Sequence, residues 1–168
     1  MISTEKANDS SAYKYTDITD VNNNQNESLS TLNEWSVNFA DINPDKNFIA
    51  PSNLSKVYFH TIKYSGGCLY LWIGDQSAKL ESLSCSMKTP FLPEPLTTAL
   101  LSSRTQSECC VDATNDLACK LAKRLKKQVF LSLSVSFSVI NNADVQDTCL
   151  KLIEMALFKE IALNPHKF

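Results

Sequence analysis

Residues 57–73 read VYFHTIKYSGGCLYLWI, and this stretch decides the fold. Apolar and polar side chains alternate from Val57 to Tyr64, the period of two that a β-strand requires. A second strand pattern runs from Cys68 to Ile73. Ser65-Gly66-Gly67 separates the two runs, and paired glycines supply the positive φ that a tight turn needs. The stretch therefore predicts an antiparallel hairpin.

Upstream of this hairpin, the chain contains one more strand pattern. Trp35, Val37 and Phe39 alternate with polar residues and predict a first strand, followed by a proline-containing loop over residues 41–55. Residues 1–31 are rich in Asn, Ser, Thr and Asp and hold too little apolar surface to offset the entropy of ordering. We expect a disordered polar tail over 1–31 and one domain over 32–168.

Downstream, a strand is expected from Leu80 to Met87, followed by a long connection over residues 88–113 with one short strand at Thr97 to Leu101. Thr114-Asn115-Asp116 offers helix N-cap chemistry, and apolar residues follow it at helical spacing. A strand from Val129 to Val139 comes next. A last helix is expected from Asp144 to Leu163, ending before Pro165. This order predicts an α+β domain: an antiparallel sheet with helices packed on it and a strand–helix–strand–helix C-terminal half.

The last helix carries more apolar residues than one buried face requires. On a helical wheel, Met155 and Phe158 fall opposite the main apolar half, among charged residues. Either the domain itself covers both sides of this helix, or these two side chains contact a partner protein, because Met and Phe are favoured at interface cores.

The predicted sheet offers a second candidate surface. Tyr70 and Trp72 share one face of a strand whose other face is filled by leucine and isoleucine, so both faces need cover. The alternating serines at 82–86 and 132–138 give two other strands a face of small residues. That serine face could meet water, or it could pack closely on a second sheet supplied by another chain.

Composition limits the classes of partner and compartment. The formal net charge is -2, which argues against a nucleic-acid partner. The sequence has neither a secretory signal pattern nor an apolar stretch of the roughly 20 residues that span a bilayer, so no membrane partner is expected. The six cysteines are expected as free thiols in a reducing compartment, the cytoplasm, with the nucleus as a second location.

Catalytic motifs are missing from the sequence. With three glycines there is no phosphate-binding glycine pattern, and the two histidines give no zinc-ligand spacing. A hydrolase built on Cys68 or Cys85 would need a thiol of lowered pKa. The one local Cys/His combination joins His60 and Cys68, and Cys68 stands in an apolar strand instead. We therefore expect no enzyme, no catalytic residue, and no metal or other cofactor.

The second half of the chain resembles a known family. Leu117-Ala118-x-x-Leu121-Ala122, followed by residues 127–132 (KQVFLS), is similar to the helix-to-strand junction of the proteasome assembly chaperone 4 family. The tail Pro165-His166-Lys167-Phe168 is similar to that family's ending, although His166 stands where the family has Glu. Residues 69–74 (LYLWIG) look like its Leu-Trp-[Val/Ile]-Gly turn. The resemblance covers roughly residues 56–168.

The resemblance implies a function without chemistry. Members of that family pair with a proteasome assembly chaperone 3-like protein, bind proteasome α subunits and promote formation of the α-ring of the 20S core particle. The alternative reading is a non-enzymatic, longin-like trafficking or signalling adaptor. Our candidate interface residues are Tyr70, Trp72, Met155 and Phe158, together with Lys167 and Phe168 at an end expected to be exposed.

Overall fold

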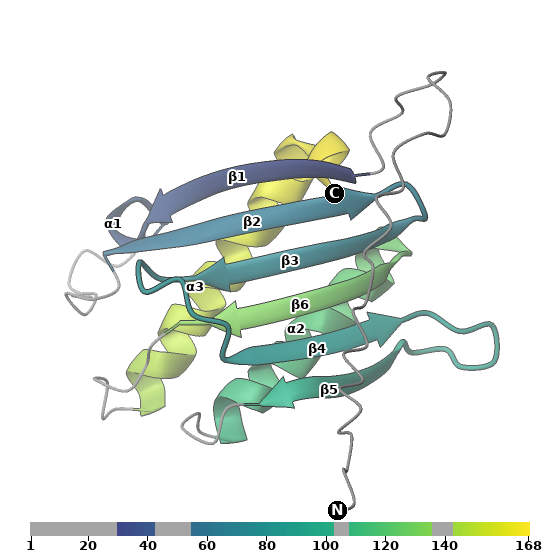
Figure 1. The fold of residues 1–168 in the computed structure, drawn as a ribbon. Coiled ribbons are helices and arrows are strands. Elements are labelled where there is room, and N and C mark those ends of the chain that lie inside the picture. The colour runs from purple at the N-terminus through teal and green to yellow at the C-terminus, as the bar shows by residue number, and fades with distance from the viewer. Residues whose placement is uncertain (1–29, 43–54, 103–107, 136–142) are drawn as a thin grey trace, which may run out of the picture.

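The computed structural model describes residues 30–42, 55–102, 108–135 and 143–168, which build one six-stranded sheet with two long helices on it (Figure 1). In chain order the elements are β1 (Ser30–Asn38), α1 (Phe39–Ile42), β2 (Lys56–Tyr64), β3 (Cys68–Gly74), β4 (Ser82–Met87), β5 (Leu96–Ser102), α2 (Glu108–Leu125), β6 (Gln128–Ser134), α3 (Ala143–Leu163) and the short 3-10 helix η2 (Pro165–Lys167). Most of the expected polar tail lies outside the described residues, and β1 begins at Ser30.

The strands lie in the order β1-β2-β3-β6-β4-β5. Neighbouring strands run antiparallel except for β3 and β6, which are parallel at the centre of the sheet. The expected α+β class and the expected hairpin at β2–β3 are confirmed, with Gly67 at φ 80° in the turn between the two strands. Because β6 enters between β3 and β4, the sheet is mixed rather than purely antiparallel.

Helices α2 and α3 cover one face of the sheet, and the core lies between them and the strands (Figure 1). Side chains of residues paired across a ladder point to the same face, so the register assigns the fully buried apolar residues of β2, β3 and β6 to this face. The largest fully buried side chains of those strands are Val57, Phe59, Leu69, Leu71, Ile73, Leu131 and Leu133. Leu121, Ile153 and Leu157 meet them from the helices.

The two serine patterns do not share a face, contrary to expectation. Ser84 pairs with Leu131, which places the β4 serines on the face that α2 covers. There the Ser82 hydroxyl lies 3.2 Å from the Thr114 hydroxyl and donates to the Leu133 carbonyl at 2.7 Å. Ser132 pairs with Trp72 on the opposite face. The β4 serines therefore meet neither water nor a second sheet; their hydroxyls are satisfied inside the domain.

The expected strand from Val129 to Val139 differs from the structure, because β6 ends at Ser134 and residues 136–139 lie outside the described residues. Two further boundaries differ because of tertiary contacts. Helix α2 begins at Glu108, so Thr114 is an interior helix residue, and its buried hydroxyl bonds Ser82 instead of capping the helix. Phe39 does not extend the first strand: it begins α1, where its backbone N–H donates to the Ser55 carbonyl at 3.1 Å and its side chain is 1% exposed. In both cases a tertiary contact overrides the local pattern.

A tight contact between an indole ring and a glycine ends β3. The Trp72 indole N–H donates to the Lys79 carbonyl at 2.9 Å, which holds the ring over Gly74. A Cβ added at Gly74 would come within 2.2 Å of that ring. No side chain larger than hydrogen fits at position 74 while the indole keeps its hydrogen bond.

Gly74→Ala is therefore expected to lower the free energy of unfolding by about 1–3 kcal/mol, the usual cost of forcing an extra carbon into a packed site. Urea denaturation followed by tryptophan fluorescence measures it. Gly66→Ala is the matched control, because nothing lies within 4 Å of a Cβ at that position. Equal stability of the two variants would contradict the close packing of the Trp72 indole on Gly74.

Candidate protein-binding surfaces

The face of the sheet opposite α2 and α3 carries an apolar row across five strands. The register of paired residues aligns this row, which we call the central stripe: Leu32, Ile62, Tyr70, Phe130 and Cys85. Leu32 is 59% exposed and the other four are half-buried. Both long helices lie on the other face (Figure 1). An apolar sheet face on which none of the described helices packs is a candidate site for another protein.

A polar row runs beside the central stripe. Glu34 pairs with His60, His60 with Trp72, and Trp72 with Ser132 along neighbouring strands. The Glu34 carboxylate lies 2.8 Å from His60 Nδ1, and the His60 ring meets the Trp72 ring edge-on at 5.1 Å between centroids. A protein that packs on this face must therefore accommodate a carboxylate–imidazole pair beside an apolar stripe.

Tyr70 stands at the middle of the central stripe. Burial raises the pKa of its phenol above the usual value, and the nearby Tyr64 raises it further. The hydroxyl therefore remains neutral throughout the physiological pH range. A neutral, half-buried tyrosine suits the core of a protein interface, where aromatic side chains are enriched and charges are depleted.

Tyr70 and Trp72, both chosen from the sequence, are brought onto this one face. They are not equally available, because the indole of Trp72 is tied to the chain between β3 and β4. In the same region the Ser134 hydroxyl accepts from the backbone N–H of Glu81 at 3.0 Å, and Ser134 is buried. The chain between β3 and β4 thus covers the Trp72 end of the sheet face opposite α2 and α3, which we call the open face. The central stripe lies beyond this covered end.

Met155 and Phe158 lie on a different surface, a groove beside α3 with a cavity volume of about 780 Å³. Met155 is 57% exposed. The Phe158 ring is half-buried beneath the Arg124 guanidinium, whose carbon lies 4.9 Å from the ring centroid. The groove is lined by Asp41, Ile42, Lys120, Arg124, Lys151, Glu154, Met155, Ala156, Phe158 and Lys159. The Met155 and Phe158 side of α3 is thus partly covered by α2 of the same domain.

The expectation that Lys167 and Phe168 lie at an exposed end is wrong. Phe168 is 3% exposed and packs edge-on against Trp35, with ring centroids 5.6 Å apart. The Lys167 ammonium contacts Glu160 Oε1 at 2.5 Å and lies 5.5 Å from the centre of the Trp35 ring. Both residues fasten the end of the described chain to β1 and α3.

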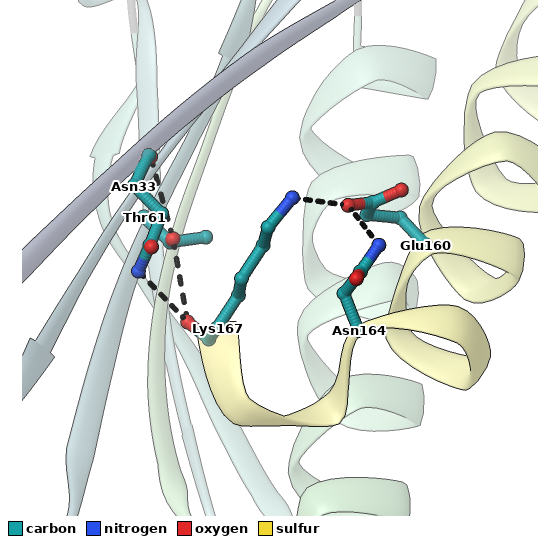
Figure 2. Close-up of polar contacts among 5 residues, drawn as sticks. All are labelled: Asn33, Thr61, Glu160, Asn164 and Lys167. Atoms are coloured by element: carbon teal, nitrogen blue, oxygen red, sulfur yellow. Dashed lines mark hydrogen bonds and ion pairs between the residues drawn. The ribbon is translucent and has the colours of Figure 1, made fainter.

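Figure 2 shows how this fastening is made. The Lys167 carbonyl accepts long hydrogen bonds from the Asn33 side-chain amide at 3.4 Å and the Thr61 hydroxyl at 3.5 Å. Glu160 Oε1 accepts from both the Lys167 ammonium and the Asn164 amide, at 2.5 and 2.8 Å. The tail is thus held by its main chain on the sheet side and by its side chain on the helix side.

Reversal of the charge at Lys167 is expected to destabilise the fold. Lys167→Glu would set two carboxylates against each other at Glu160, in a contact whose partners are only 24% and 19% exposed. We expect a loss of about 1–3 kcal/mol in the free energy of unfolding, between the values typical of exposed and buried pairs. The control is Lys159→Glu, because Lys159 is exposed and forms no ion pair with a described residue. Equal urea denaturation midpoints for the Lys167→Glu and Lys159→Glu proteins would refute the prediction.

Four contributors to the central stripe were missed as interface residues in the sequence: Leu32, Ile62, Phe130 and Cys85. Period-two alternation marks each as lying on the face opposite its core neighbours. Alternation does not show which strands are adjacent in the sheet. The central stripe could therefore not be identified before the parallel pairing of β3 with β6 was known.

The structure separates the residues considered for catalysis. His60 pairs with Trp72 in the ladder and not with Cys68, which pairs with Gln128 on β6. Within the described residues, no group of three or more His, Cys, Asp or Glu side chains is placed to hold a metal ion. None of the described helices is long and apolar enough to cross a membrane.

Comparisons with known proteins give the family. A chain from a crystal structure of a novel chaperone complex for yeast 20S proteasome assembly aligns with a TM-score of 0.46 and 13% identity, over 76% of this chain and 97% of that one. The family profile described as Proteasome assembly chaperone 4 matches residues 56–135. Proteasome assembly chaperone 4 of Mus musculus is 30% identical over 112 residues, which cover 67% of this chain and 80% of the mouse protein. The chain therefore belongs to the proteasome assembly chaperone 4 family.

Proposed function

We propose that this proteasome assembly chaperone acts without enzymatic chemistry, as a heterodimer with a proteasome assembly chaperone 3-like partner. The pair binds proteasome α subunits and promotes formation of the α-ring of the 20S core particle. No nucleotide, metal, nucleic acid or membrane takes part. The protein works in the cytoplasm, with the nucleus as a second location. Family membership supports the general function, and the open sheet face supports the pairing.

The open face carries this proposal because of its composition. The central stripe crosses the sheet from Leu32 on β1 to Cys85 on β4 without a charged residue. A sheet of six strands spans roughly 24 Å across its strands, and each strand extends roughly 20 Å. That footprint, on the order of 500 Å² in projection, approaches one side of a standard interface of about 800 Å² of accessible surface per partner. A partner sheet that packs on it would have to use nearly the whole face.

The polar row sets the selectivity of that contact. A partner must place polar groups opposite the atoms of Glu34 and His60 that lie outside their mutual 2.8 Å contact, because burying polar atoms without hydrogen bonds costs free energy even within an ion pair. A purely apolar sheet would leave the pair unsatisfied. This requirement favours one complementary chain over other proteins with an exposed apolar sheet.

The mechanism that we propose for the heterodimer is templating of the α-ring. A rigid heterodimer that holds neighbouring α subunits in register lowers the entropic cost of the next docking event. The interface with the α subunits must be weak enough, or must be covered at a later stage, for the chaperone to leave before the core particle matures. Of the sequence-chosen candidates, Tyr70 and Trp72 belong to the open face, while Met155 and Phe158 belong to the α3 groove.

A pull-down of the tagged full chain from its native cell extract tests the proposal, with the bound proteins identified by mass spectrometry. The expected result is one partner of similar size with sequence similarity to proteasome assembly chaperone 3, plus free α subunits and no mature β subunits. Recovery of membrane-coat or GTPase components in their place would favour the longin-like adaptor and overturn the chaperone assignment.

A further inference from the structure

Exposed apolar side chains concentrate on the hairpin formed by β4 and β5. Of the eleven exposed large hydrophobic residues in the described part of the chain, six lie between positions 87 and 101. They are Met87, Phe91, Leu92, Leu96, Leu100 and Leu101. The most exposed is Phe91 at 91%, at the tip of the hairpin, followed in sequence by Leu92 at 50%. A phenylalanine this exposed contributes almost nothing to the core of its own domain.

The base of the hairpin is fixed to the body of the protein. Pro95 is buried, and its carbonyl lies 3.9 Å from the Cys119 sulfur on α2. The Ser86 and Thr97 hydroxyls are 2.8 Å apart across the two strands. The Lys123 ammonium also contacts Glu94 at 2.6 Å, although both side chains are more than half exposed, and such a pair adds little. Burial and the strand ladder therefore hold the base.

The tip itself is stiffened by its sequence. Residues 90–93 read Pro-Phe-Leu-Pro, and Pro95 follows. Each proline ring fixes φ near -65°, which reduces the number of conformations open to the segment. An apolar tip whose conformation is already restricted loses less entropy when it binds. The hairpin thus has the properties of a preorganised anchor.

The position of the tip separates it from the open sheet face. In Figure 1 the connection between β4 and β5 extends well past the ends of the neighbouring strands. A partner sheet centred on the central stripe, whose residue on β4 is Cys85, would leave Phe91 free for another protein. The projecting shape also fits a cleft and not a flat sheet surface.

We infer that the tip Pro90-Phe91-Leu92-Pro93 inserts into an apolar cleft on a proteasome α subunit. The exposed Lys88, which forms no ion pair with any described residue, lies beside the tip and favours an acidic side chain at the rim of such a cleft. Phe91 is the anchor, since one buried aromatic ring commonly dominates the affinity of an interface. This inference rests on the proposed function and adds to it the site that holds the α subunit.

The test uses the full-length tagged chain expressed in its native cells, with the captured proteins quantified by mass spectrometry. The variant carries Phe91→Ser and Leu92→Ser together. The matched control is Leu163→Ser, which removes an apolar side chain that is 66% exposed on α3. The double variant is expected to capture at least about tenfold less α subunit per chain, while capture of the chaperone 3-like partner stays within twofold of wild type.

Each alternative outcome has a distinct meaning. Unchanged capture of α subunits by the double variant overturns the inference and leaves the proposed function standing. Parallel loss of the chaperone partner also overturns it, because the tip would then belong to the heterodimer interface. A wild-type chain that captures its chaperone partner but no α subunit overturns both the inference and the α-subunit part of the proposed function.

A photo-crosslinker gives an independent readout. The full chain carries benzoylphenylalanine at position 91 or, as a second probe, at position 70 on the open face. The expected crosslink is to an α subunit from position 91 and to the chaperone 3-like protein from position 70. A crosslink from position 91 to the chaperone partner, or none from 91 when 70 reacts, contradicts the inference.

Discussion

Phe59→Ala is expected to lower the free energy of unfolding by about 3–5 kcal/mol, a large part of the stability of a domain of this size. The Phe59 side chain is fully buried and stacks on Trp35 with ring centroids 5.0 Å apart and planes within 4°. Trp35 in turn packs against Phe168 and the Lys167 ammonium. Loss of the Phe59 ring therefore leaves a cavity and also removes the support of the β1 edge and the C-terminal tail.

Urea denaturation monitored by far-UV circular dichroism measures this loss. Tyr64→Ala is the control within the same strand, because Tyr64 is 41% exposed and its truncation is expected to cost less than about 1 kcal/mol. A Phe59→Ala protein as stable as the Tyr64→Ala protein would show that the β1–β2 side of the sheet contributes little to the fold.

The largest effect on binding is expected for Tyr70→Glu. This change places a carboxylate at the centre of the central stripe, where a packed partner would bury it without a counter-charge. We expect the dissociation constant for the proposed chaperone 3-like partner to rise at least about 100-fold, which corresponds to about 2.7 kcal/mol. Titration of the purified partner by isothermal calorimetry measures it.

The control for this experiment introduces the same negative charge at a different position. Leu163→Glu also replaces a large apolar residue by glutamate, but at a position that is 66% exposed on α3. It is expected to bind the partner within twofold of wild type. Tyr70→Glu must also keep a cooperative unfolding transition, since the residue is only half-buried. A folded Tyr70→Glu protein with undiminished affinity would exclude the open face as the pairing surface.

Much of the fold could be predicted from local pattern. The β2–β3 hairpin follows from alternation on both sides of Gly66-Gly67, and α3 runs from Ala143 to Leu163 almost as its periodicity indicates. The start of α2 could not be predicted in the same way. Thr114 has the side chain of an N-cap, but the hydroxyl of Ser82, 32 positions earlier, satisfies it inside the helix.

The candidate site was predictable only in part. Tyr70 and Trp72 were placed correctly on one strand face, because alternation within a strand is a local property. Their neighbours on that face depend on strand order, which no local signal encodes. Lys167 and Phe168 were expected at an exposed end, yet contacts to Glu160, Asn33 and Thr61 hold that end against the sheet and α3. The exposure of Phe91 could not be predicted from the sequence either, because it depends on how the β4–β5 hairpin projects past the sheet.

The central place of β6 has a consequence for the order in which the chain folds. Strands β3 and β4 are separated by a short turn in sequence but have β6 between them in the sheet. Leu71 meets Leu131 only after 60 further residues have been added. A nascent chain that ends before Gln128 holds β1–β2–β3 and the β4–β5 hairpin as two unjoined pieces, each with an unpaired edge and apolar surface. Contacts this distant in sequence raise contact order and slow folding. The chaperone is itself open to aggregation during synthesis until β6 closes its sheet.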